Sequence, residues 1–320
     1  MTTRDHSIVV LTGGSGGAKL VRGLDLALGG TALTVIVNTG DDVTWWGLHV
    51  SPDIDSVTYA LAGLLSRERG WGFEGDSFQC LEQMRRLGAP AWFQLGDRDL
   101  ALHLTRTELL REGKTLTEAT AHIAQPFGIS ARILPMSDER VETRVLTTEG
   151  ELNFQEYFVR ERFRPEVRSV RFVGAENATP APGVLAEIAS ATAVVIAPSN
   201  PITSIGPILA VPGIRDALRW PDASVIAVSP IVGGAAVSGP AGNLMKAAGL
   251  PVSLEGLAVA YSDFLNVLIA DVQDEEAPLR DAAIELHFAD TIMRTDDDKV
   301  RLAHFIVEVA ASRQRKVAIG

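Results

Sequence analysis

The sequence predicts an α/β protein built on a mostly parallel β-sheet with helices on both faces. Short apolar runs alternate along most of the chain with longer stretches in which apolar residues have helical spacing. The short runs are continuously apolar rather than alternating, which is typical of strands buried on both faces. With 320 residues, of which 46% are hydrophobic, the chain is long enough to bury a substantial core.

The chain opens with a strand, a glycine cluster and a helix. Residues 7–12 form an apolar run, glycines follow, and residues 20–28 have helical spacing. A second buried strand is predicted at residues 33–38. Beyond it we expect a short strand at residues 91–95 and helices at residues 53–65, 76–87, 100–111 and 117–127.

The middle of the chain has a different pattern. Strand-like segments follow one another at residues 130–134, 142–147, 151–159 and 167–172. We therefore predict a small insertion of antiparallel strands at residues 136–176, with residues 1–135 and 177–320 forming the core domain. In the remainder we expect helices at residues 183–191 and 299–311, and strands at residues 193–197, 224–229, 257–261 and 267–269.

Charge and composition exclude several classes of function. The formal net charge of -11 argues against a nucleic-acid partner, which requires a basic face. No stretch is long and apolar enough to span a bilayer, and residues 1–7 lack an apolar signal segment. These observations predict a cytoplasmic protein without a membrane partner. The single cysteine, Cys80, excludes an internal disulfide, and we expect it to be buried as a small hydrophobe.

The first candidate site is the glycine cluster after the first strand. A glycine loop between a strand and a helix lets backbone N–H groups approach a phosphate, and the helix N-terminus adds a partial positive charge. The cluster is not a P-loop, and Lys19 replaces the last glycine of the dinucleotide fingerprint. The alternative is a tight turn without a ligand. The predicted substrate-binding residues here are Gly13, Gly14, Ser15, Gly16, Gly17 and Lys19.

Acidic side chains form two further candidate sites. The segment Asn38–Asp42 follows the second strand, where ligands of parallel sheets bind, and adjacent carboxylates there suit Mg²⁺ shared with substrate phosphates. Asp53 and Asp55 lie two positions apart at a helix start, so their side chains point in different directions. Helix caps and exposed acids are the alternatives. We predict substrate contacts from Asn38 and Thr39, metal ligands in Asp41, Asp42 and Asp53, and catalytic roles for Asp42 and Asp55.

Two polar loops complete the set. Residues 94–99 follow a predicted strand, and Arg98 there pairs either with a phosphate or with neighbouring acids. Residues 198–206 follow a buried strand and are rich in hydroxyl and amide groups, which hydrogen-bond a ribityl chain, a nucleobase or a phosphate without adding charge. The predicted substrate-binding residues of these loops are Gln94, Gly96, Asp97, Arg98, Ser199, Asn200, Thr203 and Ser204.

The remaining motifs carry weaker signals. The adjacent Trp45 and Trp46 either stack on a flat heteroaromatic ring, or pack locally or in a subunit contact, and the packing alternative is favoured. The six histidines show no metal spacing, and we expect His103, His122 and His304 to be surface or packing residues. No order of serine, histidine and aspartate indicates a covalent hydrolase.

Eight segments, in this order, resemble the 2-phospho-L-lactate transferases of coenzyme F420 biosynthesis, and the resemblance runs from Ile8 to the closing helix. The segments read LTGGSGGAKL, VNTGDD, SPDIDSVTY, LGDRD, ILPMSDERV, APSNPITSIGPI, SPIVGG and VSGPAGNLM. The resemblance implies a Rossmann-like core sheet with a small inserted α/β subdomain, and a homodimer.

The same resemblance implies a Mg²⁺-dependent reaction. A guanosine-diphosphate-linked three-carbon acid, phospholactate or enolpyruvyl phosphate, would be the donor and the deazaflavin Fo the acceptor. The terminal ribityl hydroxyl would attack the acid-bearing phosphorus, and GMP would leave. By motif, Asp55 and Gln94 would contact Fo. Other members can have lysine in place of Gln94, so that contact keeps a hydrogen bond and loses a charge. The loops Gly13–Lys19 and Ser199–Ser204 would hold nucleotide and acceptor.

Two other classes stay open as alternatives. Related regulatory proteins that bind a nucleotide sugar share the glycine loop, but they tend to follow their paired acids with a glycine- and serine-rich run. Here Asp41 and Asp42 are followed by Val43–Trp46. A dinucleotide-dependent oxidoreductase is disfavoured by the incomplete glycine fingerprint and by the lack of an acid at the distance expected for a ribose contact.

Overall fold

The computed structural model describes residues 7–29, 32–219, 223–275, 279 and 283–319, with side chains up to residue 315. The predicted lack of a signal segment concerns residues 1–7, of which only Ser7 lies among the described residues.

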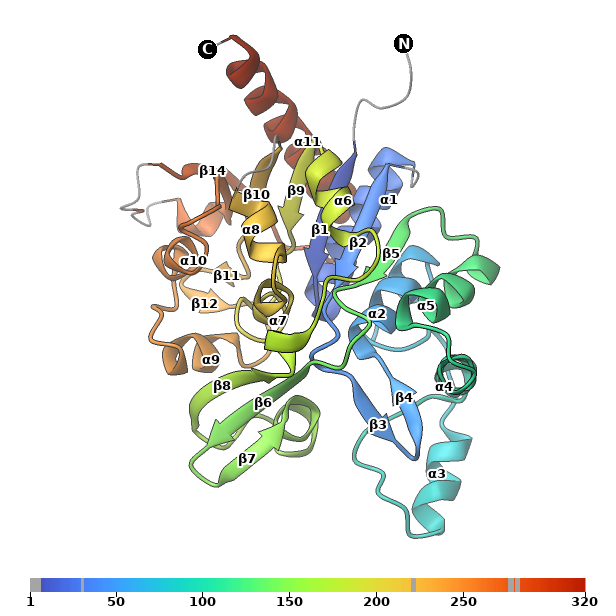
Figure 1. The fold of residues 1–320 in the computed structure, drawn as a ribbon. Helices are drawn as coiled ribbons and strands as arrows, with labels where there is room; N and C mark the ends of the chain where they lie inside the picture. The colour runs from blue at the N-terminus through green and yellow to red at the C-terminus, as the bar shows by residue number, and fades with distance from the viewer. Residues whose placement is uncertain (1–6, 30–31, 220–222, 276–278, 280–282, 320) are drawn as a thin grey trace.

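A seven-stranded parallel sheet forms the centre of the molecule (Figure 1). Its strands are β1 (Ile8–Thr12), β2 (Leu33–Val37), β5 (Arg132–Pro135), β9 (Ala193–Ile196), β10 (Ser224–Val228), β13 (Val267–Asp271) and β14 (Glu285–Ala289). They lie in the order β14-β13-β10-β9-β1-β2-β5, and every pairing is parallel. The chain therefore builds outward from β1 in both directions, and the strand order reverses between β1 and β9.

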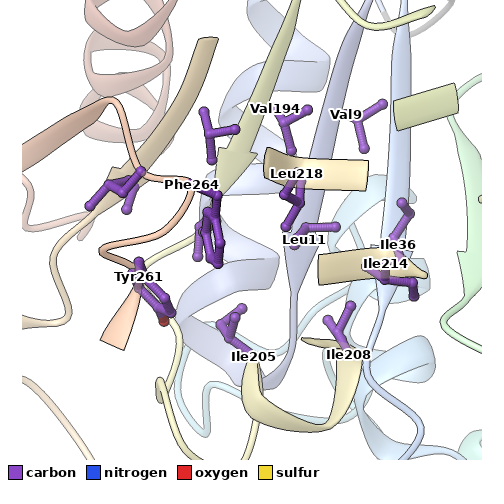
Figure 2. Packing of buried hydrophobic residues seen from close by; sticks show 14 of the residues in the cluster. Val9, Leu11, Ile36, Val194, Ile205, Ile208, Ile214, Leu218, Tyr261 and Phe264 are labelled. Atoms are coloured by element: carbon purple, nitrogen blue, oxygen red, sulfur yellow. The ribbon is translucent and has the colours of Figure 1, made fainter. Parts of the chain in front are cut away.

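Helices cover both faces of this sheet, which confirms the predicted α/β fold class. One layer packs on the face that includes Val10, Val35 and Val195, and it contains α1 (Gly14–Leu28), α2 (Pro52–Leu61), α5 (Leu116–Ala124) and α11 (Asp296–Ile319). The other layer contains α6 (Val184–Ser190), α7 (Gly206–Ala210), α8 (Ile214–Arg219) and α10 (Leu254–Ala260). Figure 2 shows side chains of this second layer, Ile208, Ile214 and Leu218 among them, against Val9, Leu11, Ile36 and Val194 of the sheet.

The remaining helices lie at the edges. They are α3 (Gln79–Arg86), α4 (Asp97–Arg111) and α9 (Ala241–Ala247), with short helical turns η1 (Gln125–Phe127), η2 (Glu156–Arg160), η3 (Ala175–Asn177) and η4 (Val272–Asp274). Within the described ranges, no helix has both the length and the hydropathy needed to cross a membrane. Cys80 is exposed, so its predicted burial is wrong; of the residues in α3, only Leu81 is buried.

Three small antiparallel sheets lie outside the central one. They are the hairpin β3 (Val43–Trp45) and β4 (Leu48–Val50), the hairpin β11 (Ile231–Val232) and β12 (Ala235–Ala236), and the sheet of β6 (Glu142–Thr147), β7 (Gly150–Asn153) and β8 (Val167–Val173). The three-stranded sheet lies beyond the carboxyl ends of the central strands (Figure 1). There the Thr143 N–H donates to Gly40 O at 2.7 Å, and the Gln155 amide donates to Asp41 O at 3.1 Å. This segment therefore holds the acidic loop after β2, whereas the division of the chain into a core and an insertion stays a prediction.

The strand predicted at residues 257–261 is wrong, because residues 257–260 lie in α10 and Tyr261 is its C-cap. The Ser253 hydroxyl caps that helix by accepting from the Gly256 N–H at 3.4 Å. The buried Leu254 and Leu257 are three positions apart, which is the spacing of one helix face.

The strand predicted at residues 151–159 is correct only in its first part. β7 ends at Asn153, and the π-helix η2 follows. Asn153 and Glu156 exchange hydrogen bonds, since the Glu156 N–H donates to Asn153 Oδ1 at 2.8 Å and the Asn153 N–H donates to Glu156 Oε2 at 3.1 Å. This reciprocal capping starts a helical turn and ends the strand.

The strand predicted at residues 91–95 is absent, because aromatic packing decides the conformation of this segment. Trp92 and Phe93 pack on Trp45, with ring centroids 4.6 and 5.8 Å away. Trp46 lies on the same cluster, with its ring centroid 5.8 Å from that of Trp45. Local packing of the two adjacent tryptophans, the favoured interpretation, is therefore what the structure shows.

We predict that Gly23→Ala destabilises the protein where α1 crosses α11. A Cβ at Gly23 would overlap the Lys299 carbonyl, so the two helices would have to separate. The free energy of unfolding in urea should fall by about 1–3 kcal/mol. In the control Gly242→Ala, the new Cβ would meet Val252 Cγ1 at an ordinary 3.5 Å, and stability should rise by up to about 1 kcal/mol. Equal effects of the two substitutions would contradict the close helix crossing.

Candidate functional site

The candidate site lies at the carboxyl ends of β1 and β9, where the strand order reverses. Ligands of open parallel sheets bind at such a point. The glycine loop after β1 and the loop at residues 198–205 after β9 face each other there. Ser199 joins them, because its hydroxyl donates to Gly13 O at 2.7 Å and lies 3.4 Å from the Gly13 N–H. The structure thus brings together two loops that are almost two hundred positions apart in the sequence.

Two glycines make this close approach possible. A Cβ at Gly13 would lie 2.6 Å from Asp53 Oδ2 and 2.8 Å from Ser204 Cβ, and a Cβ at Gly17 would lie 2.6 Å from Ser199 Oγ. A side chain at either position would push the glycine loop away from the second loop or from α2. Glycine is needed here for proximity rather than for an unusual backbone angle.

The N-terminus of α1 points into the site. The Gly14 N–H donates to Asp53 Oδ1 at 2.7 Å, so a protein carboxylate already occupies part of this positive helix end. The N–H groups of Ser15 and Gly16 have no acceptor among the described residues. Lys19 is half-buried and forms no ion pair in that part of the chain. These groups can therefore receive an anion beside Asp53.

Asn38 ties the acidic loop to both neighbouring segments. Its amide donates to Asp53 Oδ2 at 2.9 Å and to Thr203 O at 3.3 Å, while its Oδ1 accepts from the Gly40 N–H at 2.8 Å. Asn200 has a comparable role in its own loop, since its Oδ1 accepts the N–H of Ile202 at 2.9 Å. Both amides therefore shape the loops, and the hydroxyls of Thr39 and Thr203 remain buried without a hydrogen-bond partner among the described residues.

Three buried carboxyl groups converge on this region. Burial raises the pKa of Asp53 to about 6, and burial, together with the Asp53 charge, raises the pKa of Asp41 well above its ordinary value. Burial also raises the pKa of Asp42, against hydrogen bonds that lower it. Within the described residues, the Oδ1 atoms of Asp41 and Asp42 are buried and have no hydrogen-bond partner. Such groups are stabilised by a proton or a cation.

The side chain of Asp42 is held on one side only. Its Oδ2 accepts from the Ser51 hydroxyl at 2.7 Å and lies 2.9 Å from His49 Nε2. Its other oxygen is therefore available to a ligand. The described residues hold no group of three carboxylate, imidazole or thiol side chains arranged to hold a metal ion. Two unpartnered carboxylate oxygens nevertheless fit Mg²⁺, which commonly takes one or two carboxylates and completes its shell with water and substrate phosphates.

Asp53 and Asp55 point in different directions, as their spacing predicted. Asp53 faces the glycine loop, whereas Asp55 faces α4 and forms a bidentate ion pair with Arg106. The second hydrogen bond of this pair, from Nη1 to Oδ2, is 3.2 Å long. His103 Nδ1 lies 3.6 Å from the same carboxylate, and burial lowers the pKa of His103 to about 4, so this histidine is neutral at pH 7.

A further buried pair continues this network. The Tyr59 hydroxyl of α2 donates to Asp99 Oδ1 of α4. Burial raises the pKa of Asp99 to about 6, against the Tyr59 hydrogen bond, which lowers it. The pair joins α2 to α4 next to Asp55, and it places a carboxyl group that titrates near neutral pH inside the protein.

The loop at residues 94–99 is placed differently from what the sequence indicated, because no strand precedes it. Gln94 and Arg98 are exposed, and buried Gly96 packs against Asp76. Asp97 accepts from the Ser77 hydroxyl at 2.6 Å and from two backbone N–H groups at the start of α3. Among the described residues no hydrogen bond joins these four to the glycine loop, so their substrate contacts stay predictions.

The sequence pattern does not identify several residues that the fold brings to the site. His49 and Ser51 bind Asp42, and His103 and Arg106 bind Asp55. One signal for the second pair exists: Asp99, His103 and Arg106 follow a helical i, i+4, i+7 spacing, so polar side chains lie on the face of α4 that is buried. No local pattern identifies His49 or Ser51.

The raised pKa of Asp99 predicts a pH-dependent stability. The folded protein holds a proton that the unfolded chain releases above its ordinary pKa of 3.8, so this contribution is lost as pH rises through about 6. Asn does not titrate. Between pH 4 and pH 7, Asp99→Asn should therefore gain stability relative to wild type by up to about 3 kcal/mol in urea unfolding. The exposed Asp290→Asn should follow the wild-type curve, and parallel curves for all three would contradict the prediction.

Comparisons with known proteins identify relatives that match nearly the whole chain. The family model described as 2-phospho-L-lactate transferase CofD matches residues 8–310. The 2-phospho-L-lactate transferase of Methanosarcina mazei is 42% identical over 303 residues, covering 94% of this chain and 99% of that protein. The 2-phospho-L-lactate transferase of Methanocaldococcus jannaschii is 43% identical (95% and 98% covered), and the phosphoenolpyruvate transferase of Streptomyces griseus is 44% identical (88% and 93% covered).

A solved structure shows the same fold. A protein of the UPF0052 family from Bacillus halodurans superimposes with a TM-score of 0.64 at 16% identity, covering 94% of this chain and 98% of that one. At this identity the likeness concerns the α/β fold alone. The family model and the sequence relatives go further, since both span nearly the whole chain, and they show that this chain is a transferase enzyme belonging to the 2-phospho-L-lactate transferase CofD family.

Proposed function

We propose that this enzyme transfers a phosphorylated three-carbon acid, 2-phospholactate or enolpyruvyl phosphate, from a guanosine diphosphate carrier to the deazaflavin Fo. The observation that carries the proposal is the meeting of the glycine loop with residues 198–205, beside acids that have unpartnered oxygens. A diphosphate needs amide donors and a divalent cation, and the α1 N-terminus and the neighbouring carboxylates offer positions for both.

In this proposal, the glycine loop binds the donor. The free N–H groups of Ser15 and Gly16 hydrogen-bond diphosphate oxygens, and Lys19 on the next turn of α1 adds a positive charge. Thr203 and Ser204 offer hydroxyls from the opposite loop, and the Thr203 hydroxyl has no partner among the described residues. Binding through amides and hydroxyls avoids adding charge beside the acids.

Asp41 and Asp42 are the residues that would hold Mg²⁺, with Asp53 close by. When bound, the ion would neutralise diphosphate charge and stabilise the charge that develops on the leaving group. Asp53 is the least free of the three, because both of its oxygens already accept hydrogen bonds from Gly14 and Asn38.

Asp55 is the proposed contact to the acceptor. The ribityl hydroxyl oxygen bonds to the acid-bearing phosphorus, the bond from that phosphorus to the GMP oxygen breaks, and the hydroxyl proton passes to the Asp55 carboxylate. We propose direct in-line attack, since transfer of this kind depends mainly on positioning and charge stabilisation. A trapped phospho-acyl enzyme would contradict it.

The proposal is tested with purified protein, Fo, Mg²⁺ and each guanylylated acid made in situ, with products followed by mass spectrometry. We expect a Mg²⁺-dependent adduct and GMP, and the mass of the adduct identifies the acid. No adduct with any donor, together with binding of a UDP-sugar, would favour the second candidate, a nucleotide-sugar-binding regulatory protein. A homodimer and a cytoplasmic location remain predictions from the resemblance and the composition.

We predict that Asp42→Asn separates catalysis from folding. The amide cannot bind Mg²⁺ as a carboxylate does, so Mg²⁺-dependent turnover should fall by about 100-fold. The free energy of unfolding should change by less than about 1 kcal/mol, since a buried acid with a raised pKa is replaced by a neutral group. Asp290→Asn is the control for loss of an exposed aspartate. A large loss of stability that matches the loss of turnover would show that Asp42 is structural.

A further inference from the structure

Arg106 is unusual among the cationic residues of this protein. It is fully buried, and no other lysine or arginine of the described residues is buried. Both of its Nη atoms donate to Asp55, one to each carboxylate oxygen. Burial lowers the pKa of Arg106, but the Asp55 carboxylate outweighs this effect and the net shift is upward. The guanidinium is therefore permanently charged and holds Asp55 in one plane.

Among the described residues, Arg106 is the one permanently charged cation that contacts Asp55. His103, whose Nδ1 lies 3.4 Å from Arg106 Nη1, is neutral at pH 7 because burial lowers its pKa to about 4. Asp99, on the same face of α4, and Asp53, on the same turn of α2, are both acids. Arg106 thus supplies, from α4, the positive charge that orients Asp55.

The contacts of Arg106 do not look like those of a purely stabilising ion pair. Its Nε–H is buried without an acceptor in the described part of the chain, and so is Nε2 of the adjacent His103. A buried ion pair with unsatisfied groups contributes little to stability compared with apolar packing. The feature this pair does provide is a single orientation for the Asp55 carboxylate.

We infer that Arg106 is a positioning residue for the transfer reaction, which orients Asp55 toward the attacking hydroxyl of the acceptor. The inference rests on the proposed function, in which Asp55 contacts that hydroxyl. A small displacement of a group that aligns two reactants lowers the rate strongly, whereas it leaves donor binding at the glycine loop unchanged. Arg106 therefore affects the acceptor half of the reaction and not the donor half.

The test compares Arg106→Lys with wild type. Lysine keeps the charge but cannot form the two parallel hydrogen bonds. We expect kcat to fall by about 10–100-fold and Fo, followed by its fluorescence, to bind more weakly, while the KM for the guanylylated donor stays within about twofold. The matched control is Arg22→Lys, because Arg22 also reaches α2, donating to Leu61 O at 3.0 Å, but its ion pair is with Asp25 and not with an acid of the site. Its kcat should equal that of wild type.

A double variant shows whether Arg106 acts through Asp55. Asp55→Asn alone and Asp55→Asn with Arg106→Lys should have the same kcat, because the second change has nothing left to misalign. The inference would be overturned if the double variant lost kcat by the product of the two single losses, or if Arg106→Lys had the kcat of wild type. The free energy of unfolding in urea shows whether each variant is folded. If Arg106→Lys does not fold, Arg106→Gln, whose amide can still donate to Asp55, takes its place in the test. An inactive wild-type protein would overturn the proposed function and this inference together.

Discussion

The geometry of the site depends on the Asp53 carboxylate, which occupies space that a Cβ at Gly13 would need. Asp53 accepts the Gly14 N–H at 2.7 Å and the Asn38 amide at 2.9 Å, and it fits because Gly13 has no Cβ. These two hydrogen bonds join the ends of β1 and β2 to the first turn of α2. Asn38 extends the link to the loop after β9 through Thr203 O. This connection therefore fixes the loops after β1, β2 and β9 relative to one another.

Acidic side chains outnumber cationic ones in the protein interior at the site. Asp41, Asp42 and Asp53 have raised pKa values, and Arg106 is directed at Asp55 instead of at them. Burying carboxyl groups without partners lowers the stability of the ligand-free protein. In the proposed function, binding of a cation together with an anionic substrate would remove that penalty, so the residues that weaken the fold would favour the ligand.

The first turn of α2 divides the site into two halves. Residues two positions apart on a helix point to different neighbours. Asp53 therefore hydrogen-bonds the glycine loop, whereas Asp55 pairs with Arg106 of α4. One rigid turn thereby sets the distance between the proposed donor and acceptor positions. Elements held by helix packing keep such distances better than loops do.

The parallel sheet, the glycine loop and the position of Asn38–Asp42 at a strand end can all be predicted from the sequence, because continuous apolar runs and glycine clusters are local signals. Other features become visible only in the folded protein. Asp55 pairs with Arg106, 51 positions away, and His49 contacts Asp42. Residues 91–95 pack on Trp45 and do not form a strand. Such contacts depend on which elements the fold brings together, and side chains that meet in this way leave no periodic pattern along the chain.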